Sequence, residues 1–186
     1  MGGLRKRIMP KQVAHREDTG ERILRMVESP IEIVEATKFD ISELLRLGWN
    51  GYKEMEFLAE GIEYDTSAVS KLYLSIMDKP ELGVIYAAKH PKIEKKLVGR
   101  IVAVVSPFLH NPSHNCIYVI GVFVDKKFRG QKIGGELMER VKQWAVKRDI
   151  KIYVVHHRTK SGPKIRENLE RDDFKPLETL YYKVIK

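Results

Sequence analysis

The segment from Val122 to Gly135 combines residue types suited to binding phosphate. An apolar run leads through a charged turn into a predicted helix start rich in glycine: Val122, Phe123, Val124, then Arg129, Gly130, Gln131, Lys132, Ile133, Gly134 and Gly135. Glycine destabilises a helix, so its presence there indicates that something approaches the backbone closely. The free N–H groups and the positive dipole end of a helix start, with nearby cations, suit a pyrophosphate. A simple glycine turn with solvated basic side chains is the alternative.

Two candidate residues for proton transfer lie on predicted strands. Tyr118 stands six residues before Val124, and a phenol with a reference pKa of about 10 is a poor base but can relay a proton through water or shape a pocket. It can equally be an aromatic residue that packs on a helix. His156 and His157 end another strand, and an imidazole titrates near neutral pH. Neighbouring strand residues face opposite ways, so at most one faces a site, and both can instead be ordinary surface residues.

The remaining candidates favour simpler interpretations. Cys116 stands on the same predicted strand as Tyr118, where a cysteine is usually buried and inert, so we expect a core residue and not a nucleophile. His110 and His114 lie in a predicted loop without further ligands, so we expect no metal site. No Walker P-loop and no GxGxxG fingerprint occurs.

The hydrophobic pattern predicts an α+β, or mixed α/β, fold around one central, mostly antiparallel sheet. Strands are expected over 31–36, 83–88, 97–105, 116–124, 150–155 and 179–185, and helices over 40–56, 66–77, 129–147 and 163–172. The strand–helix–strand order around 129–147 is a βαβ unit, so its strands should run parallel. We expect residues 1–30 to form an extension with a short helix that opens at Asp18, and residues 31–186 to form one domain.

Charge is distributed unevenly along the 186 residues. Residues 1–125 hold 17 basic and 17 acidic side chains, whereas residues 126–186 hold 17 and 8, which accounts for the whole net charge of +9. An anionic ligand is therefore expected in the last third. A single cysteine excludes a disulfide framework, and no apolar run approaches the roughly 18 residues of a membrane span, so we expect a cytoplasmic protein with no membrane contact.

The stretch Arg129-Gly130-Gln131-Lys132-Ile133-Gly134 resembles the acetyl-CoA motif of the GCN5-related N-acetyltransferases, R/Q-x-x-G-x-G/A, with Lys132 in place of the first glycine. The resemblance implies an acyl-CoA N-acyltransferase fold with acetyl-CoA as cofactor. The main chain of Val122, Phe123 and Val124 would pair with the pantetheine arm, and the glycine-rich turn would hold the pyrophosphate. The strands that carry Val122 and Val154 would splay apart to admit the cofactor.

The same resemblance implies direct acetyl transfer to a primary amine on a small molecule or a protein, by a monomer or a homodimer. The family often carries a tyrosine general acid in the late helix, but that position falls on Leu169 here. Tyr181 or Tyr182 would substitute, the thiolate would leave unaided, or the protein would be a CoA-binding regulatory module. A nucleic-acid-binding or nucleic-acid-modifying protein on the same fold is a further alternative. We expect the acceptor pocket in residues 40–66 and 106–115, with these candidates: Trp49, Tyr52, Met55, Phe57 and Tyr64.

Overall fold

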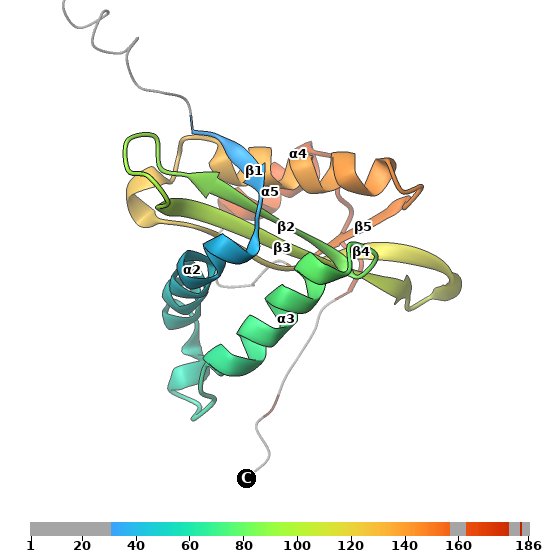
Figure 1. The fold of residues 1–186 in the computed structure, drawn as a ribbon. Helices are drawn as coiled ribbons and strands as arrows, with labels where there is room; N and C mark the ends of the chain where they lie inside the picture. Colours follow the sequence, from blue (N-terminus) through green and yellow to red (C-terminus); the bar gives the residue numbers. More distant parts are fainter. Residues whose placement is uncertain (1–30, 157–162, 179–182, 184–186) are drawn as a thin grey trace, which may run out of the picture. The chain divides into compact units, whose positions relative to one another are not determined.

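The computed structural model describes residues 31–156, 163–178 and 183 (Figure 1). The short helix expected near Asp18 and the side chain of His157 lie outside this description. So does the closing strand expected over 179–185, apart from Lys183.

A single five-stranded sheet in the order β1-β2-β3-β4-β5 forms the centre of the fold. Its strands are β1 (Ile33–Glu35), β2 (Gly83–Lys89), β3 (Leu97–Phe108), β4 (Asn111–Val124) and β5 (Ile152–Val155). Neighbouring strands are antiparallel except β4 and β5, which are parallel. The mixed α/β fold and its mostly antiparallel sheet are therefore confirmed.

The longer helices are α2 (Ile41–Lys53), α3 (Thr66–Asp78), α4 (Ile133–Val146) and α5 (Pro163–Arg171), and α2 and α3 lie on the opposite face of the sheet from α4 (Figure 1). The 3-10 turn η1 (Lys38–Asp40) directly precedes α2, η2 (Glu56–Leu58) lies between α2 and α3, and η3 (Lys126–Phe128) lies between β4 and α4. Asp65 caps α3 by accepting a hydrogen bond from the Ala68 N–H at 2.8 Å. In the part of the chain that the structure describes, no helix is long and apolar enough to cross a membrane.

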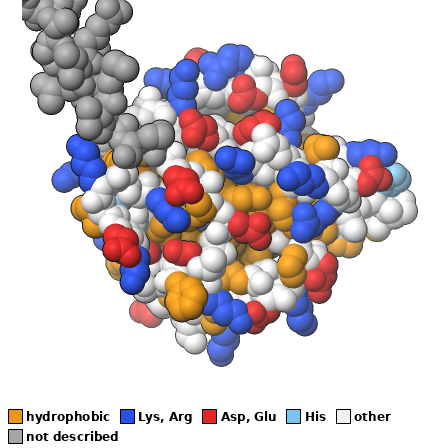
Figure 2. All heavy atoms as spheres, turned by 45° about the horizontal axis from the view of Figure 1, so that its top comes forward, with side chains coloured by type: hydrophobic (Ala, Val, Ile, Leu, Met, Phe, Trp, Pro, Cys, Tyr) orange, Lys and Arg blue, Asp and Glu red, His pale blue; other side chains and the backbone are white. Residues whose placement is uncertain are grey.

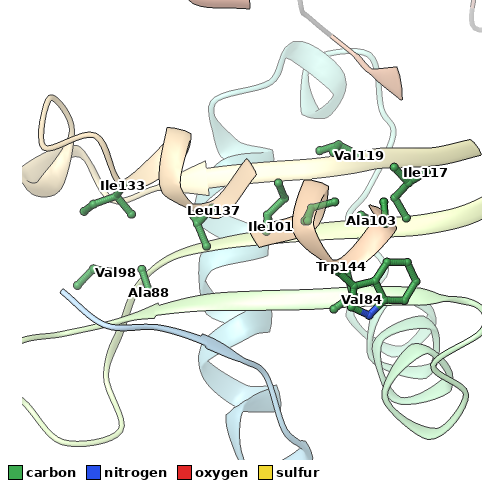
Figure 3. Close-up of a cluster of buried hydrophobic side chains, with 12 residues drawn as sticks. Val84, Ala88, Val98, Ile101, Ala103, Ile117, Val119, Ile133, Leu137 and Trp144 are labelled. Carbon is green, nitrogen blue, oxygen red and sulfur yellow. The ribbon is translucent and has the colours of Figure 1, made fainter. Parts of the chain in front are cut away.

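Two apolar cores hold the helices to the sheet. On one face, Ile133, Leu137 and Trp144 of α4 pack against strand residues such as Ile101 and Ile117 (Figure 3). On the other face, Leu44 and Leu47 of α2 and Tyr73 and Ile76 of α3 form a second core with strand residues. The strand residues are Ile85, Val102 and Phe123. Because β3 and β4 are covered on both faces, their central residues lie between two layers of helices.

Truncation of Leu137 to alanine is expected to lower the free energy of unfolding by about 2–5 kcal/mol, because the side chain is fully buried in the α4 core. Urea unfolding followed by circular dichroism would measure the loss. Lys142→Ala on the exposed face of α4 is the control, with a change within about 0.5 kcal/mol. A cost for Leu137→Ala as small as that of the control would contradict this view of the core.

Some predicted boundaries were wrong. The helix expected over 40–56 ends at Lys53, and the helix expected over 129–147 begins only at Ile133. The segment 106–115, predicted as a loop, instead continues β3 and β4 into a long hairpin that projects from the sheet (Figure 1). Backbone pairing across the hairpin outweighs the weak strand preference of its Pro, Asn and His residues.

Candidate functional site

A β-bulge in β4 changes which of its side chains point to each face of the sheet. Val119 pairs with Ala103 and Gly121 pairs with Val102, so Ile120 is the extra residue. Before the bulge, Tyr118 lies on the α2/α3 face, since its neighbours Ile117 and Val119 pack in the α4 core. The extra residue reverses the alternation, so Gly121 lies on the same face as Tyr118.

Beyond the bulge, β4 has an edge that β5 does not cover. The parallel pairing ends at Val119 and Val155, where β5 stops. In the described residues, Val122 to Val124 therefore pair only with β3. Ile120 and Val122 expose 46 % and 44 % of their surface beside this edge. An unpaired strand edge flanked by apolar side chains suits an extended ligand that carries amide groups and methylenes.

The turn between β4 and α4 has a less regular backbone than the sequence predicted. It runs through η3, then Arg129 in an extended conformation, Gly130 with φ +84° and Lys132 with φ +63°. Lys132 occupies the position where the family motif has glycine, and glycine adopts this left-handed conformation without steric cost. Lys132 adopts the left-handed conformation in spite of its Cβ atom, so the turn forms here without a glycine at this position.

The first turn of α4 provides an open surface of backbone amides. The first helical hydrogen bond of α4 runs from Glu136 N to Lys132 O at 3.1 Å, so the N–H groups of Ile133, Gly134 and Gly135 precede it. A Cβ atom placed on Gly134 or Gly135 would meet nothing within 4 Å. This open surface, at the positive end of a 14-residue helix, fits a diphosphate group.

The Arg129 side chain turns away from this surface. Its Nε donates to the Val124 carbonyl oxygen at 2.8 Å, and its Nη2 donates to both carboxylate oxygens of Glu54, at 2.8 and 3.0 Å. The guanidinium lies over the Phe123 ring, 5.4 Å from its centroid. Arg129 therefore joins the β4–α4 turn to the end of α2, and its side chain is committed to the Glu54 carboxylate, which Lys126 Nζ also approaches, at 3.9 Å.

Tyr118 and His156 are brought together. Their ring centroids lie 5.6 Å apart across the β4–β5 pair. Tyr153 and Val155 pack towards the α4 core, so strand alternation places His156 on the Tyr118 face. Partial desolvation, helped by nearby Cys116 and Glu178, raises the pKa of Tyr118, so the phenol keeps its proton at physiological pH and can act as a hydrogen-bond donor. The pair offers one exposed imidazole beside one phenol O–H.

Other predicted candidates have structural roles. Cys116 is fully buried, its thiol donates to the Ser106 carbonyl oxygen at 3.2 Å, and burial raises its pKa. A thiol held in this way is a core group, as expected, and not a nucleophile. Among the described residues, no group of three or more His, Cys, Asp or Glu side chains could hold a metal ion.

The late helix carries no tyrosine at the family position. Leu169 lies in α5, and its carbonyl oxygen accepts hydrogen bonds from the N–H groups of Asp172 and Phe174. Phe174 packs edge-on against Tyr153 of β5, with ring centroids 5.3 Å apart. The Tyr153 hydroxyl donates to the Met138 carbonyl oxygen at 3.3 Å, so this tyrosine serves the packing of β5 on α4. Tyr181 and Tyr182 lie outside the described residues.

Two glycines of α2 and one arginine of β3 belong to this region but were not predicted from the sequence. Gly48 and Gly51, three apart on α2, let the helix lie close against Arg100 of β3 and Phe123 of β4, at 3.2 and 3.1 Å from the added Cβ atoms. The signals were present: a Gly-x-x-Gly pair on an apolar helix face, and one arginine within the apolar run 97–105. Four of the predicted pocket residues form an aromatic cluster beside them: Trp49, Tyr52, Phe57 and Tyr64.

A hollow of about 530 Å³ lies between α2 and the end of β4. Its lining includes Asn50 and Lys53 of α2, Phe123 of β4 and the basic residues Lys126 and Lys127 of η3.

Among the described residues on the face seen in Figure 2, basic and acidic side chains alternate around a group of apolar ones. This face therefore lacks the continuous positive stripe that tracks a nucleic-acid backbone.

Comparisons with known proteins agree with this geometry. The family model described as acetyltransferase (GNAT) family matches residues 42–163. Curated protein sequences yield no match.

Similar solved structures share the fold. A possible acetyltransferase from Clostridium difficile 630 has a TM-score of 0.61 at 21 % identity, over 84 % of this chain and 99 % of the other. A predicted acetyltransferase from Clostridium acetobutylicum, solved with acetyl-CoA, has a TM-score of 0.63 at 15 % identity, over 83 % and 96 %. A transcriptional regulator from Bacillus halodurans C-125 has a TM-score of 0.64 at 18 % identity, over 83 % and 100 %.

Proposed function

Because the chain belongs to the acetyltransferase (GNAT) family, we propose that it transfers an acetyl group from acetyl-CoA directly to a primary amine. The observation that carries the proposal is the combination of the uncovered β4 edge with the open amides at the start of α4. Residues 31–186 would form the catalytic domain, and residues 1–30 an extension of it.

Acetyl-CoA is the cofactor that family membership implies, and two stretches of the chain suit it. The backbone of Val122 to Val124 would hold the pantetheine arm, as an added strand does. The amides from Arg129 to Gly135 would hold the diphosphate, with the dipole of α4 directed at it. The exposed side chains of Lys126, Lys127 and Lys132 add positive charge there, which explains part of the basic excess in the last third of the chain.

Bound acetyl-CoA supplies a thioester that an uncharged amine can attack, with release of CoA thiol. We assign His156 the role of the base that accepts a proton from the amine, because its imidazole is exposed beside Tyr118 and a neutral imidazole has a nitrogen lone pair that can take the proton. Tyr118 keeps its proton and donates a hydrogen bond beside it, as its raised pKa supports. Both lie where β4 and β5 cease to pair, which is where the acyl group and the amine would meet.

Isothermal titration with acetyl-CoA, followed by a free-thiol release assay on a panel of amines, tests the proposal. We expect binding with a Kd between about 1 μM and 1 mM, and thiol release that depends on an added amine. The panel should include polyamines, aminoglycosides and short peptides. Absence of acetyl-CoA binding would overturn the proposal, and binding without thiol release would favour a regulatory module. Salt-sensitive binding of RNA or DNA, without binding of acetyl-CoA, would favour the nucleic-acid alternative.

A further inference from the structure

Arg100 is a buried cation without an anionic partner. It projects from the middle of β3 towards α2 and α3 and exposes only 8 % of its surface. Among the described residues, no carboxylate forms an ion pair with its guanidinium, and its Nε has no hydrogen-bond partner. A buried charge is costly unless it is paired, so this arrangement calls for an explanation.

The residues around Arg100 do not neutralise it. The Tyr73 ring lies 5.5 Å from the guanidinium carbon, and the Tyr64 hydroxyl, itself buried without a hydrogen-bond partner, lies beside the same helix residue, Gly48. Burial raises the pKa of Tyr73, and it raises that of Tyr64 to about 12. Both phenols are therefore neutral at physiological pH, and the cluster Arg100–Tyr64–Tyr73 keeps a positive charge.

The guanidinium reaches the uncovered part of β4. A Cβ atom on Gly121 would lie 3.4 Å from Nη1 of Arg100, so the absent side chain lets the cation approach the strand at the bulge. Gly121 is only partly buried and lies two residues after Val119, the last residue of β4 that pairs with β5. Tyr118 and His156 lie on the same face of the sheet, so an anion bound by Arg100 would be on the acceptor side.

We propose that Arg100 binds a carboxylate of the acceptor, which makes the acceptor an amino acid or a peptide-like amine. The inference rests on the proposed acetyl transfer and names its substrate class. A guanidinium binds a carboxylate through two parallel N–H···O bonds, which fixes orientation as well as position. The free amine of the same molecule would then be held towards His156. The aromatic rings of Tyr64 and Trp49 would contact its side chain.

Pairs of amines that differ only in a carboxylate test the inference. L-phenylalanine with 2-phenylethylamine, and L-lysine with 1,5-diaminopentane, should be compared for thiol release and for binding to the CoA-loaded protein. The wild type should favour the member with the carboxylate by about 10- to 100-fold in kcat/KM or Kd, the range for a lost charge-assisted hydrogen bond. The preference should vanish in Arg100→Met and weaken in Arg100→Lys, with the binding of acetyl-CoA unchanged.

The melting temperature of Arg100→Met distinguishes a ligand-binding role of Arg100 from a structural one. If the unpaired charge serves a ligand, Arg100→Met should unfold at the same temperature as the wild type or higher, because it removes a buried cation. A lower melting temperature with an unchanged carboxylate preference would make Arg100 structural. Gly121→Ala is the second variant, since its Cβ fits at an ordinary contact distance but narrows the approach to Arg100. It should reduce the preference even if Arg100→Met fails to fold.

The outcomes also separate this inference from the proposed function. Binding of acetyl-CoA with equal use of both members of each pair would overturn the role of Arg100 alone. A preference for O-phosphoethanolamine over ethanolamine, without one for the carboxylates, would assign the anion to a phosphate and contradict the inference. Failure to bind acetyl-CoA would overturn the proposed function itself.

Discussion

Replacement of Gly134 by valine is expected to weaken acetyl-CoA binding by at least about 100-fold while the protein stays folded. The loss corresponds to two charge-assisted hydrogen bonds between amides and diphosphate. Nothing lies within 4 Å of the Cβ position at Gly134, so valine fits the unliganded protein but its methyl groups cover the amides of the first turn. Glycine is the poorer helix former by about 0.5–1 kcal/mol relative to alanine, so no loss of stability is expected.

Titration calorimetry of Gly134→Val and Gly134→Ala, with melting curves of both, would measure these effects. Alanine should cause the smaller loss of affinity because it adds a single methyl group. Glu139→Val, at an exposed position about one and a half turns further along the same helix, is the matched control and should bind acetyl-CoA normally. Wild-type affinity in Gly134→Val would show that the diphosphate lies elsewhere.

Replacement of His156 by alanine is expected to lower kcat by about 100- to 10,000-fold, the usual contribution of a general base. Acetyl-CoA affinity should change little, because the cofactor is expected along β4 and α4 and not at this ring. Added imidazole should restore part of the activity, which a structural defect would not allow. Lys142→Ala, on the exposed face of α4, is the control and should keep the wild-type kcat.

Substitution of Tyr118, the neighbour of His156, should lower kcat less than substitution of His156. Tyr118→Phe removes a hydrogen-bond donor but leaves the imidazole, so we expect a loss of about 10-fold. Because the pKa of Tyr118 is raised above the usual value of about 10, its deprotonation should diminish activity only at pH values above that. A wild-type kcat in His156→Ala would refute the assignment of the base, whatever the result for Tyr118.

Much of the architecture follows from the sequence because it rests on local patterns. Hydrophobic periods of two and of three to four residues placed the central strands and α3 to within a few residues. The Arg129–Gly135 motif identified the family and the turn that would hold the diphosphate, since its glycines are defined by spacing along the chain. The Gly134 experiment could be designed from the sequence alone, and the structure adds that the variant has room to fold.

The proposed acceptor side depends on contacts between residues that are far apart in the chain, which local sequence patterns do not reveal. Without the bulge at Ile120, Tyr118 and Val122 would lie on one face of β4, and only the pairing with β3 reveals the extra residue that separates them. Arg129 meets Glu54 across 75 residues, and Arg100 meets α2 through Gly48. The sequence thus determined the fold, the family and the position of the cofactor motif. Strand register and helix packing decided which side chains share the acceptor face, because both depend on residues far apart in the chain.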